Sequence, residues 1–82
     1  MNIRYFAWLR ERLGRAEDFL DVAPADTVER VVDRLIASDE VLAAAMEKRA
    51  IFKFALDARV VPASSAVGAA KTLAILPPMT GG

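Results

Sequence analysis

Apolar and polar residues alternate at the start of the chain, which predicts a strand followed by a short helix. Residues 2–6 have the period of two that is typical of a strand with one buried face. Apolar side chains one turn apart predict a two-turn helix over residues 7–13, and Gly14 is placed to end it in a left-handed conformation. Trp8 in this helix is interpreted as a packing residue, with stacking on a ligand as the alternative. A second strand, antiparallel to the first, is expected within residues 15–22.

The strongest periodicity in the chain predicts an amphipathic helix across residues 28–36. Five apolar side chains fall on one helical face: Val28, Val31, Val32, Leu35 and Ile36. Asp26 or Thr27 is the expected N-cap, and Asp26 with Glu29 has the spacing of a capping box. The charged residues between the apolar positions are interpreted as a face that points into water.

The second half of the chain is predicted to contain a short helix and three strands. The helix is expected to run from its cap, Ser38, to about Lys48, with a narrower apolar face and shallower packing. Residues 52–56 alternate as a strand, and residues 57–59 can turn the chain into a short second arm at residues 60–61. A loop then leads to a final apolar strand at residues 71–76.

Together these elements predict an α+β fold in which one main helix lies across a mixed sheet. A right-handed crossover through the long helix would place the carboxyl-terminal strand centrally, beside the first strand. This is the β-grasp, or ubiquitin-like, arrangement. One domain is expected over residues 1–76, because a chain of 82 residues has room for a single core. Residues 77–82 are expected to form an extended tail.

The tail is predicted to leave the fold as a stiff, extended segment and to end in two residues without side chains. Pro77 and Pro78 fix φ and remove two backbone donors, so neither a helix nor a central strand can continue through them. Gly81 and Gly82 have no Cβ, so another protein could close tightly around their backbone. The six residues after Leu76 span on the order of 20 Å when extended, which is enough to enter a neighbour's active site.

Composition argues against most forms of self-contained catalysis. The chain has no cysteine and no histidine, so it lacks a thiolate nucleophile, a Ser-His-Asp triad, a disulfide framework and the usual zinc ligands. Eleven basic residues balance eleven acidic ones and are interspersed with them, which argues against nucleic acid or an anionic membrane as a partner. With neither a signal-peptide pattern nor a stretch long enough to span a membrane, a cytoplasmic location is expected.

The chain resembles the small, sulfur-carrying subunit of molybdopterin synthase, and the resemblance in order and length of elements covers essentially all of it. Two stretches carry the resemblance: Phe6-Ala7-x-Leu9-Arg10-Glu11-x-x-Gly14 after the first strand, and Leu76-Pro77-Pro78-Met79-Thr80-Gly81-Gly82 at the end. A terminal Gly-Gly alone is a weak signal. Pro-Pro-x-x-Gly-Gly at the exit of a final apolar strand is much more specific.

The resemblance implies a carrier whose working group is its own terminal carboxylate. An E1-like adenylating enzyme would use ATP to form an acyl-adenylate on Gly82, and a sulfur donor would then convert this group into a thiocarboxylate. Within the large catalytic subunit of molybdopterin synthase, in an assembly that the family suggests is a heterotetramer, the sulfur would attack a pterin precursor. Two deliveries would build the dithiolene that holds molybdenum. This chain would bind no cofactor or metal and would supply no catalytic side chain, which agrees with the missing histidine and cysteine.

The resemblance also assigns roles along the tail. Gly82 would carry the sulfur and Gly81 would pass through a narrow channel, the alternative for both being a frayed terminus. Pro77 and Pro78 would keep the tail extended and lower the entropy lost on insertion, the alternative being a simple strand terminator.

Five further residues were considered for contact with a partner. Met79 and Thr80 would line the partner's tunnel with apolar and polar contact. Phe6, Phe54 and Leu76 are interpreted mainly as core residues, with contact to the partner as the alternative, because the sequence does not say which face of the sheet is covered.

Two positions depart from the family pattern, and other functions stay open. The turn before the last strand, commonly Gly-Asp-Glu in the family, reads Gly68-Ala69-Ala70, and Asp57 stands where the middle hairpin typically has asparagine. Sulfur carriers for thiamine's thiazole, for a cysteine pathway or for tRNA thiolation are the alternatives within the fold. A non-carrier β-grasp interaction module, with inert terminal glycines, is the alternative from another class.

Overall fold

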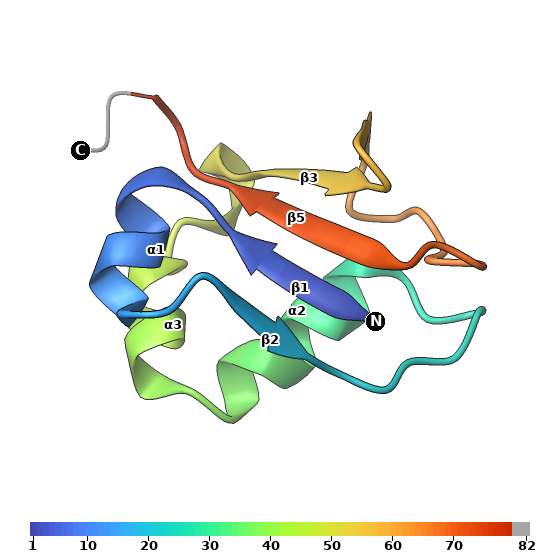
Figure 1. The fold of residues 1–82 in the computed structure, drawn as a ribbon, viewed down its shortest axis with the longest axis horizontal. Coiled ribbons are helices and arrows are strands. Elements are labelled where there is room, and N and C mark those ends of the chain that lie inside the picture. The colour runs from blue at the N-terminus through green and yellow to red at the C-terminus, as the bar shows by residue number, and fades with distance from the viewer. Residues whose placement is uncertain (80–82) are drawn as a thin grey trace.

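A five-stranded mixed sheet forms the centre of the protein in a computed structural model that describes residues 1–79 (Figure 1). The elements in chain order are β1 (Asn2–Tyr5), α1 (Ala7–Leu13), β2 (Glu17–Phe19), α2 (Val28–Ala37), α3 (Glu40–Ala45), the short 3-10 helix η1 (Arg49–Ile51), β3 (Lys53–Leu56), β4 (Arg59–Val61) and β5 (Thr72–Leu76). Their order is the predicted one, with η1 as an addition.

The carboxyl-terminal strand β5 lies at the centre of the sheet, as predicted. The strand order is β2-β1-β5-β3-β4, and β5 runs parallel to β1 and antiparallel to β3. The register pairs Ile3 with Leu73 and Tyr5 with Ile75, and all four side chains are almost completely buried. This topology, with the helices packed on the buried face, is the predicted β-grasp fold.

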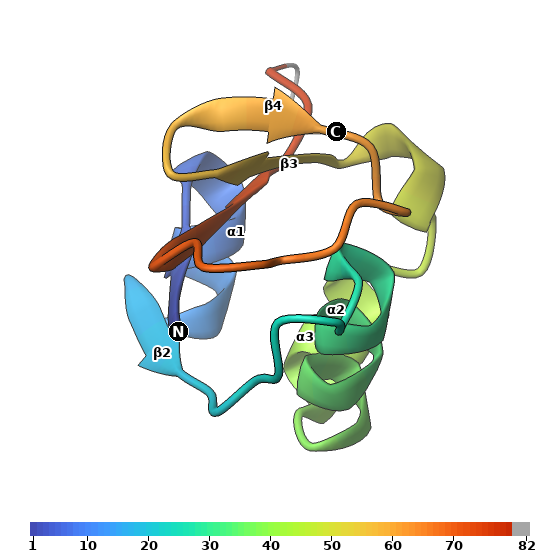
Figure 2. The same ribbon diagram turned by 90° about the vertical axis from the view of Figure 1, so that its right-hand side faces the viewer.

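Helix α2 buries its predicted apolar stripe in the core, and α3 packs beside it on the same side of the sheet (Figure 2). Four of the five stripe residues are buried: Val28, Val31, Val32 and Leu35. Of the two candidate caps, Thr27 is the one used, because its hydroxyl accepts a hydrogen bond of 3.2 Å from the Arg30 amide. The Asp26 carboxylate instead accepts a bond of 2.9 Å from the Ala23 amide, within the preceding turn.

The cap of α3 differs from the predicted one. Asp39, rather than Ser38, caps this helix, because its carboxylate accepts bonds of 2.9 and 3.1 Å from the amides of Val41 and Leu42. Ser38 belongs to the end of α2, where its hydroxyl donates to the Leu35 carbonyl. Ser38 and Asp39 both have side chains that can cap a helix. Because Ser38 ends α2, Asp39 is the residue that begins α3.

The predicted length and depth of α3 are also wrong. The helix ends at Ala45 rather than near Lys48. Leu42 is inaccessible and Met46 is only 2% exposed, because α3 lies against both α1 and α2. The short helix is therefore part of the main core rather than a satellite of it.

Strand β2 is shorter than the predicted span of residues 15–22. Its pairing with β1 reaches back to the beginning of the chain, where the Met1 amino group donates to the Leu20 carbonyl and the Leu20 amide donates to the Met1 carbonyl. The strand itself covers only Glu17–Phe19.

A tight hairpin joins β3 to β4, as predicted, through Asp57 and Ala58. Both residues have positive φ, 47° and 71°, which is the requirement of a two-residue turn matched to the twist of the strands. The Asp57 carboxylate accepts bonds of 3.0 and 3.1 Å from the amides of Lys71 and Thr72. Asp57 thus fixes the entry into β5, which gives the departure from asparagine a local structural role.

None of the helices in residues 1–79 has both the length and the apolar character needed to cross a membrane.

Candidate functional site

The tail leaves the fold beside the start of α1. Because β1 and β5 run parallel, the segments that follow them emerge at the same end of the sheet. Strand β1 leads through Phe6 into α1, while β5 ends at Leu76 and continues into the two prolines (Figure 1). The pairing of these strands therefore brings residues from opposite ends of the chain together around the base of the tail.

Trp8 contacts the tail directly. Its indole Nε1 donates a hydrogen bond of 3.3 Å to the carbonyl oxygen of Pro78, 70 positions away in the chain. The Arg12 guanidinium lies 5.0 Å over the Trp8 ring, and the tilted Phe52 ring has its centroid 5.8 Å away. A cation on one aromatic ring and a second ring against it restrict the rotamers that the half-buried indole can adopt.

The backbone of α1 positions Trp8 through an uncommon conformation at its first residue. Ala7 has φ of 50°, in the left-handed region that residues with a Cβ rarely adopt, and it turns the chain from β1 directly into α1. At the other end, Gly14 has φ of 72° and closes the helix by donating to the carbonyls of Arg10 and Glu11, as predicted.

The three residues considered as partner contacts lie at different depths. Phe54 is a core residue and only 4% exposed. Phe6 and Leu76 are half-buried at the base of the tail, and the Arg4 guanidinium lies 5.5 Å over the Phe6 ring. In the free protein, therefore, Phe6 and Leu76 present surface at the exit and Phe54 does not.

The structure describes the first half of the tail. Pro77 and Pro78 are half-buried, whereas the Met79 side chain is fully exposed. Thr80, Gly81 and the predicted sulfur-carrying residue Gly82 lie outside the described residues.

Two alanines occupy neighbouring positions on the central strands, on the face of the sheet opposite the core. The register places Ala74 of β5 beside Arg4 of β1 and beside Ala55 of β3. Val60, opposite Ala55 on β4, is 61% exposed. Ala55 is itself only 5% exposed, so the accessible surface of this face comes from its neighbours rather than from Ala55.

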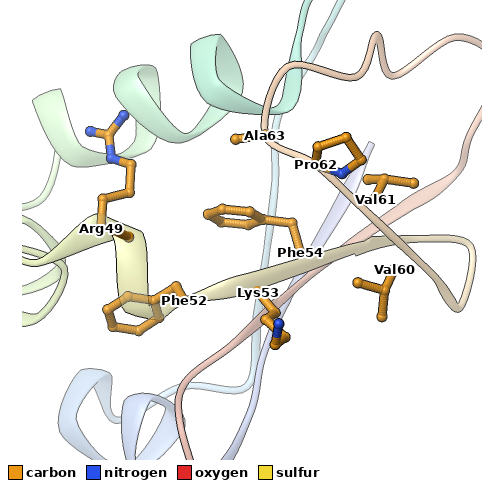
Figure 3. A pocket seen from close by; sticks show the side chains of 9 residues that line it. Arg49, Phe52, Lys53, Phe54, Val60, Val61, Pro62 and Ala63 are labelled. Atoms are coloured by element: carbon orange, nitrogen blue, oxygen red, sulfur yellow. The ribbon is translucent and has the colours of Figure 1, made fainter.

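A groove of about 550 Å³ lies beside the β3–β4 hairpin (Figure 3). Phe54 reaches toward Ala63 from β3, and Arg49 and Lys53 are the charged residues of the lining. Arg49 forms an ion pair with Asp33 of α2. The lining contains no acid, hydroxyl or thiol that could act as a nucleophile or a proton acceptor.

A cluster of polar and charged side chains ties β1, β2 and α3 together. Arg15 bridges Asp18 at 2.8 Å and Asp39 at 2.6 Å, and the Tyr5 hydroxyl donates to Asp18 at 2.6 Å. Burial would raise the pKa of Asp18, but hydrogen bonds from Arg15 and Tyr5 outweigh it and lower the pKa below its ordinary value. The hydrogen bond from Arg15 likewise lowers the pKa of Asp39.

The other two members of the cluster keep their ordinary protonation state as well. Burial is the main cause that raises the pKa of Tyr5, and hydrogen bonds to Asp18 and Asp39 raise that of Arg15. All four groups therefore have their usual charge at neutral pH, so the cluster serves as a structural tie and offers no proton for catalysis. Within residues 1–79, no grouping of acidic side chains is suited to hold a metal ion.

The contact between Trp8 and Pro78 was not predicted from the sequence. Local periodicity places Trp8 on a helix and says nothing of residue 78. The sequence analysis predicted that the last strand lies beside the first; the structure adds that the two run parallel, which brings the start of α1 next to the tail.

Known proteins with the same fold include three solved structures. SAMP1 from Haloferax volcanii is 23% identical, with a TM-score of 0.77 over 99% of this chain and 97% of that chain. A second structure of small archaeal modifier protein 1 from H. volcanii is 22% identical, with a TM-score of 0.75 over 95% of both chains. A structure described as a candidate molybdopterin converting factor, subunit 1, from Pyrococcus furiosus is 17% identical, with a TM-score of 0.74 over 95% of both.

The sequence itself identifies the family. Among curated proteins, no relative matches the chain. The sequence model of the ThiS family matches residues 3–82, which include every strand from Ile3 onward and the whole tail. The chain therefore belongs to the ThiS family of ubiquitin-like sulfur carriers.

Proposed function

We propose that this protein is the small, sulfur-carrying subunit of a molybdopterin synthase. The observation that carries the proposal is the ending Pro-Pro-Met-Thr-Gly-Gly, directly after the central strand β5. Membership of a sulfur-carrier family supports the carrier role. One protein of the same fold is described as a molybdopterin converting factor subunit, which agrees with the proposed recipient.

The proposed chemistry takes place at the carboxylate of Gly82. On an E1-like enzyme, a carboxylate oxygen attacks the α-phosphorus of ATP, which forms an acyl-adenylate and releases pyrophosphate. Hydrogen sulfide released by the sulfur donor then attacks the acyl carbon, AMP leaves, and the sulfur loses its proton to solvent. The resulting thiocarboxylate has a soft, nucleophilic sulfur that can attack a pterin precursor bound in the large subunit.

The exit of the tail fits delivery into a partner's channel. Phe6 and Leu76 offer apolar contact at its base, and half-buried Ala74 in β5 projects only a methyl group. The proline pair limits the conformations that the tail must give up when it inserts. Since the adenylating enzyme and the large subunit both need the same tail, we expect them to bind this protein in succession rather than together.

Deletion of Gly82 tests the carrier role. In a reaction with activating enzyme, ATP, sulfur donor, large subunit and pterin precursor, the shortened protein should form no dithiolene product, because the reactive carboxylate is displaced by one residue. Ser64→Ala, on an exposed loop far from the tail in sequence, is the matched control and should keep full activity. Product formation by the shortened protein at the rate of the control would overturn the proposal.

The recipient of the sulfur is tested separately with the purified thiocarboxylate. The thiocarboxylate form of the protein should transfer its sulfur to the pterin precursor in the presence of the large subunit. If the sulfur instead passes only to a thiazole, cysteine or tRNA acceptor system, the carrier role stands and the molybdopterin assignment is wrong.

A further inference from the structure

The single tryptophan of the chain, Trp8, packs against the core and also forms a polar contact with the tail. Its ring contacts both Arg12 and Phe52, and its Nε1 donates to the Pro78 carbonyl of the tail. An indole N–H can only donate, and a half-buried indole ordinarily requires an acceptor. Here the acceptor is a backbone carbonyl of the tail.

Because the acceptor is the carbonyl of Pro78, this hydrogen bond can restrict the orientation of the tail. Pro77 and Pro78 each have φ fixed by their rings, so few torsions lie between the end of β5 and the Pro78 carbonyl. A single bond at that carbonyl therefore orients the whole peptide unit that leads into Met79. The Met79 side chain, by contrast, is fully exposed.

The left-handed backbone at Ala7 provides a second, independent observation. Ala7 has φ of 50° immediately before Trp8, a conformation that is unfavourable for alanine and persists only where the surrounding structure imposes it. It turns the chain so that α1 begins beside the tail. The strained backbone at Ala7 lies directly before Trp8, which indicates that the fold maintains the position of Trp8 beside the tail despite this cost.

We propose that Trp8 is a positioning residue that presets the direction in which the tail leaves the fold, through its bond to the Pro78 carbonyl. The inference rests on the proposed function, since a preset direction matters only if the tail enters a partner. The bond is long, at 3.3 Å, so it biases the tail without locking it. A partner can therefore still draw the terminal residues into its channel.

A spectroscopic experiment on the free protein tests the contact without any partner. Because the chain has one tryptophan, its indole N–H gives one NMR signal. We expect this proton to exchange with solvent more slowly than in a free indole, and to exchange faster in Pro78→Gly, where the carbonyl is no longer held by a ring-fixed φ. In Trp8→Phe, the ¹⁵N order parameter of the Met79 amide should fall, while it stays at the wild-type value in Arg10→Gln, an exposed control on the same helix.

Solvent-like exchange of the indole proton in the wild type, or an unchanged Met79 order parameter in Trp8→Phe, would overturn the proposal. Chemical denaturation of the same variants shows whether Trp8→Phe remains folded. A merely structural role for Trp8 would change the free energy of unfolding and leave the mobility of Met79 as it was.

A kinetic experiment tests the link to function. With the activating enzyme, Trp8→Phe should lower kcat/KM for thiocarboxylate formation about fivefold, through a higher KM at unchanged kcat, because a preset tail aids binding rather than the chemical step. An unchanged KM would refute a role of Trp8 in transfer. If the wild type itself gains no sulfur, the proposed function fails, while the NMR result still decides whether Trp8 orients the tail.

Discussion

At the scale of single residues, three residues other than glycine have a left-handed backbone conformation within the described residues 1–79. Asp57 and Ala58 form the β3–β4 turn and Ala7 begins α1. Asp57 offsets this cost with its two accepted amide bonds, and Ala7 stands beside the proposed tail contact. Ala58 has an exposed methyl side chain, which forms no hydrogen bond that could offset the cost of its backbone conformation.

Replacement of Ala58 by glycine should therefore stabilise the protein. With φ of 71°, alanine at this position costs on the order of 1 kcal/mol relative to glycine, so Ala58→Gly should raise the free energy of unfolding by up to about 1 kcal/mol. Chemical denaturation measures the change. Ala55→Gly, in strand β3, is the control and should lower stability, and a loss of stability in both variants would contradict the assignment of strain to Ala58.

At the scale of elements, hydrogen bonds at helix ends and one charged cluster join the parts of the fold. Thr27 begins α2 and Asp39 begins α3, and Asp39 also accepts from Arg15. Through Arg15 and Asp18, the start of α3 is tied to β2 and β1. This tie helps to explain why such a short helix is buried so deeply.

The N-cap of α2 should make a measurable contribution. Thr27→Ala removes the acceptor of the Arg30 amide and should lower the free energy of unfolding by about 1 kcal/mol. Thr27→Ser keeps the hydroxyl and should retain most of the stability in the same denaturation experiment. Equal losses in the two variants would show that the methyl group, rather than the cap, matters.

The charged cluster predicts a dependence of stability on pH. The pKa values of Asp18 and Asp39 are lowered in the folded protein, so their contribution is complete above the ordinary value of 3.8 and is lost as pH falls through the lower folded values. Arg15→Gln should thus be less stable than the wild type at neutral pH, and the difference should shrink in acid. Unfolding measured from pH 7 downward tests this, with Arg30→Gln as an exposed control, and a difference that stays constant with pH would contradict it.

At the scale of the whole molecule, the sequence was sufficient for the strand order and insufficient for the contacts between elements. Alternation and helical stripes identify the strands and α2 because these patterns arise from burial on one face. The choice between Ser38 and Asp39 as a cap was not predictable, because both residues have suitable side chains and only the geometry of the preceding helix decides. The depth of α3 and the contact of Trp8 with Pro78 depend on residues far away in the chain, which no local pattern encodes.

The proposed division of labour between the fold and its partners also belongs to this scale. Residues 1–79 form the sheet, the buried core and the base of the tail. The proposed reactive group is the carboxylate of Gly82 at the end of that tail. On this account the fold holds and orients the tail, while activation, sulfur and acceptor all come from partners.

The most direct measurement of this account is the intact mass of the protein after incubation with its activating enzyme, ATP and a sulfur donor. The account predicts an increase equal to the mass difference between one sulfur and one oxygen atom, located at Gly82 by fragmentation. A version with one extra residue after Gly82 should show no increase. No mass change in the native chain with a matched and active activating enzyme, or an equal change in the extended version, would contradict the central claim.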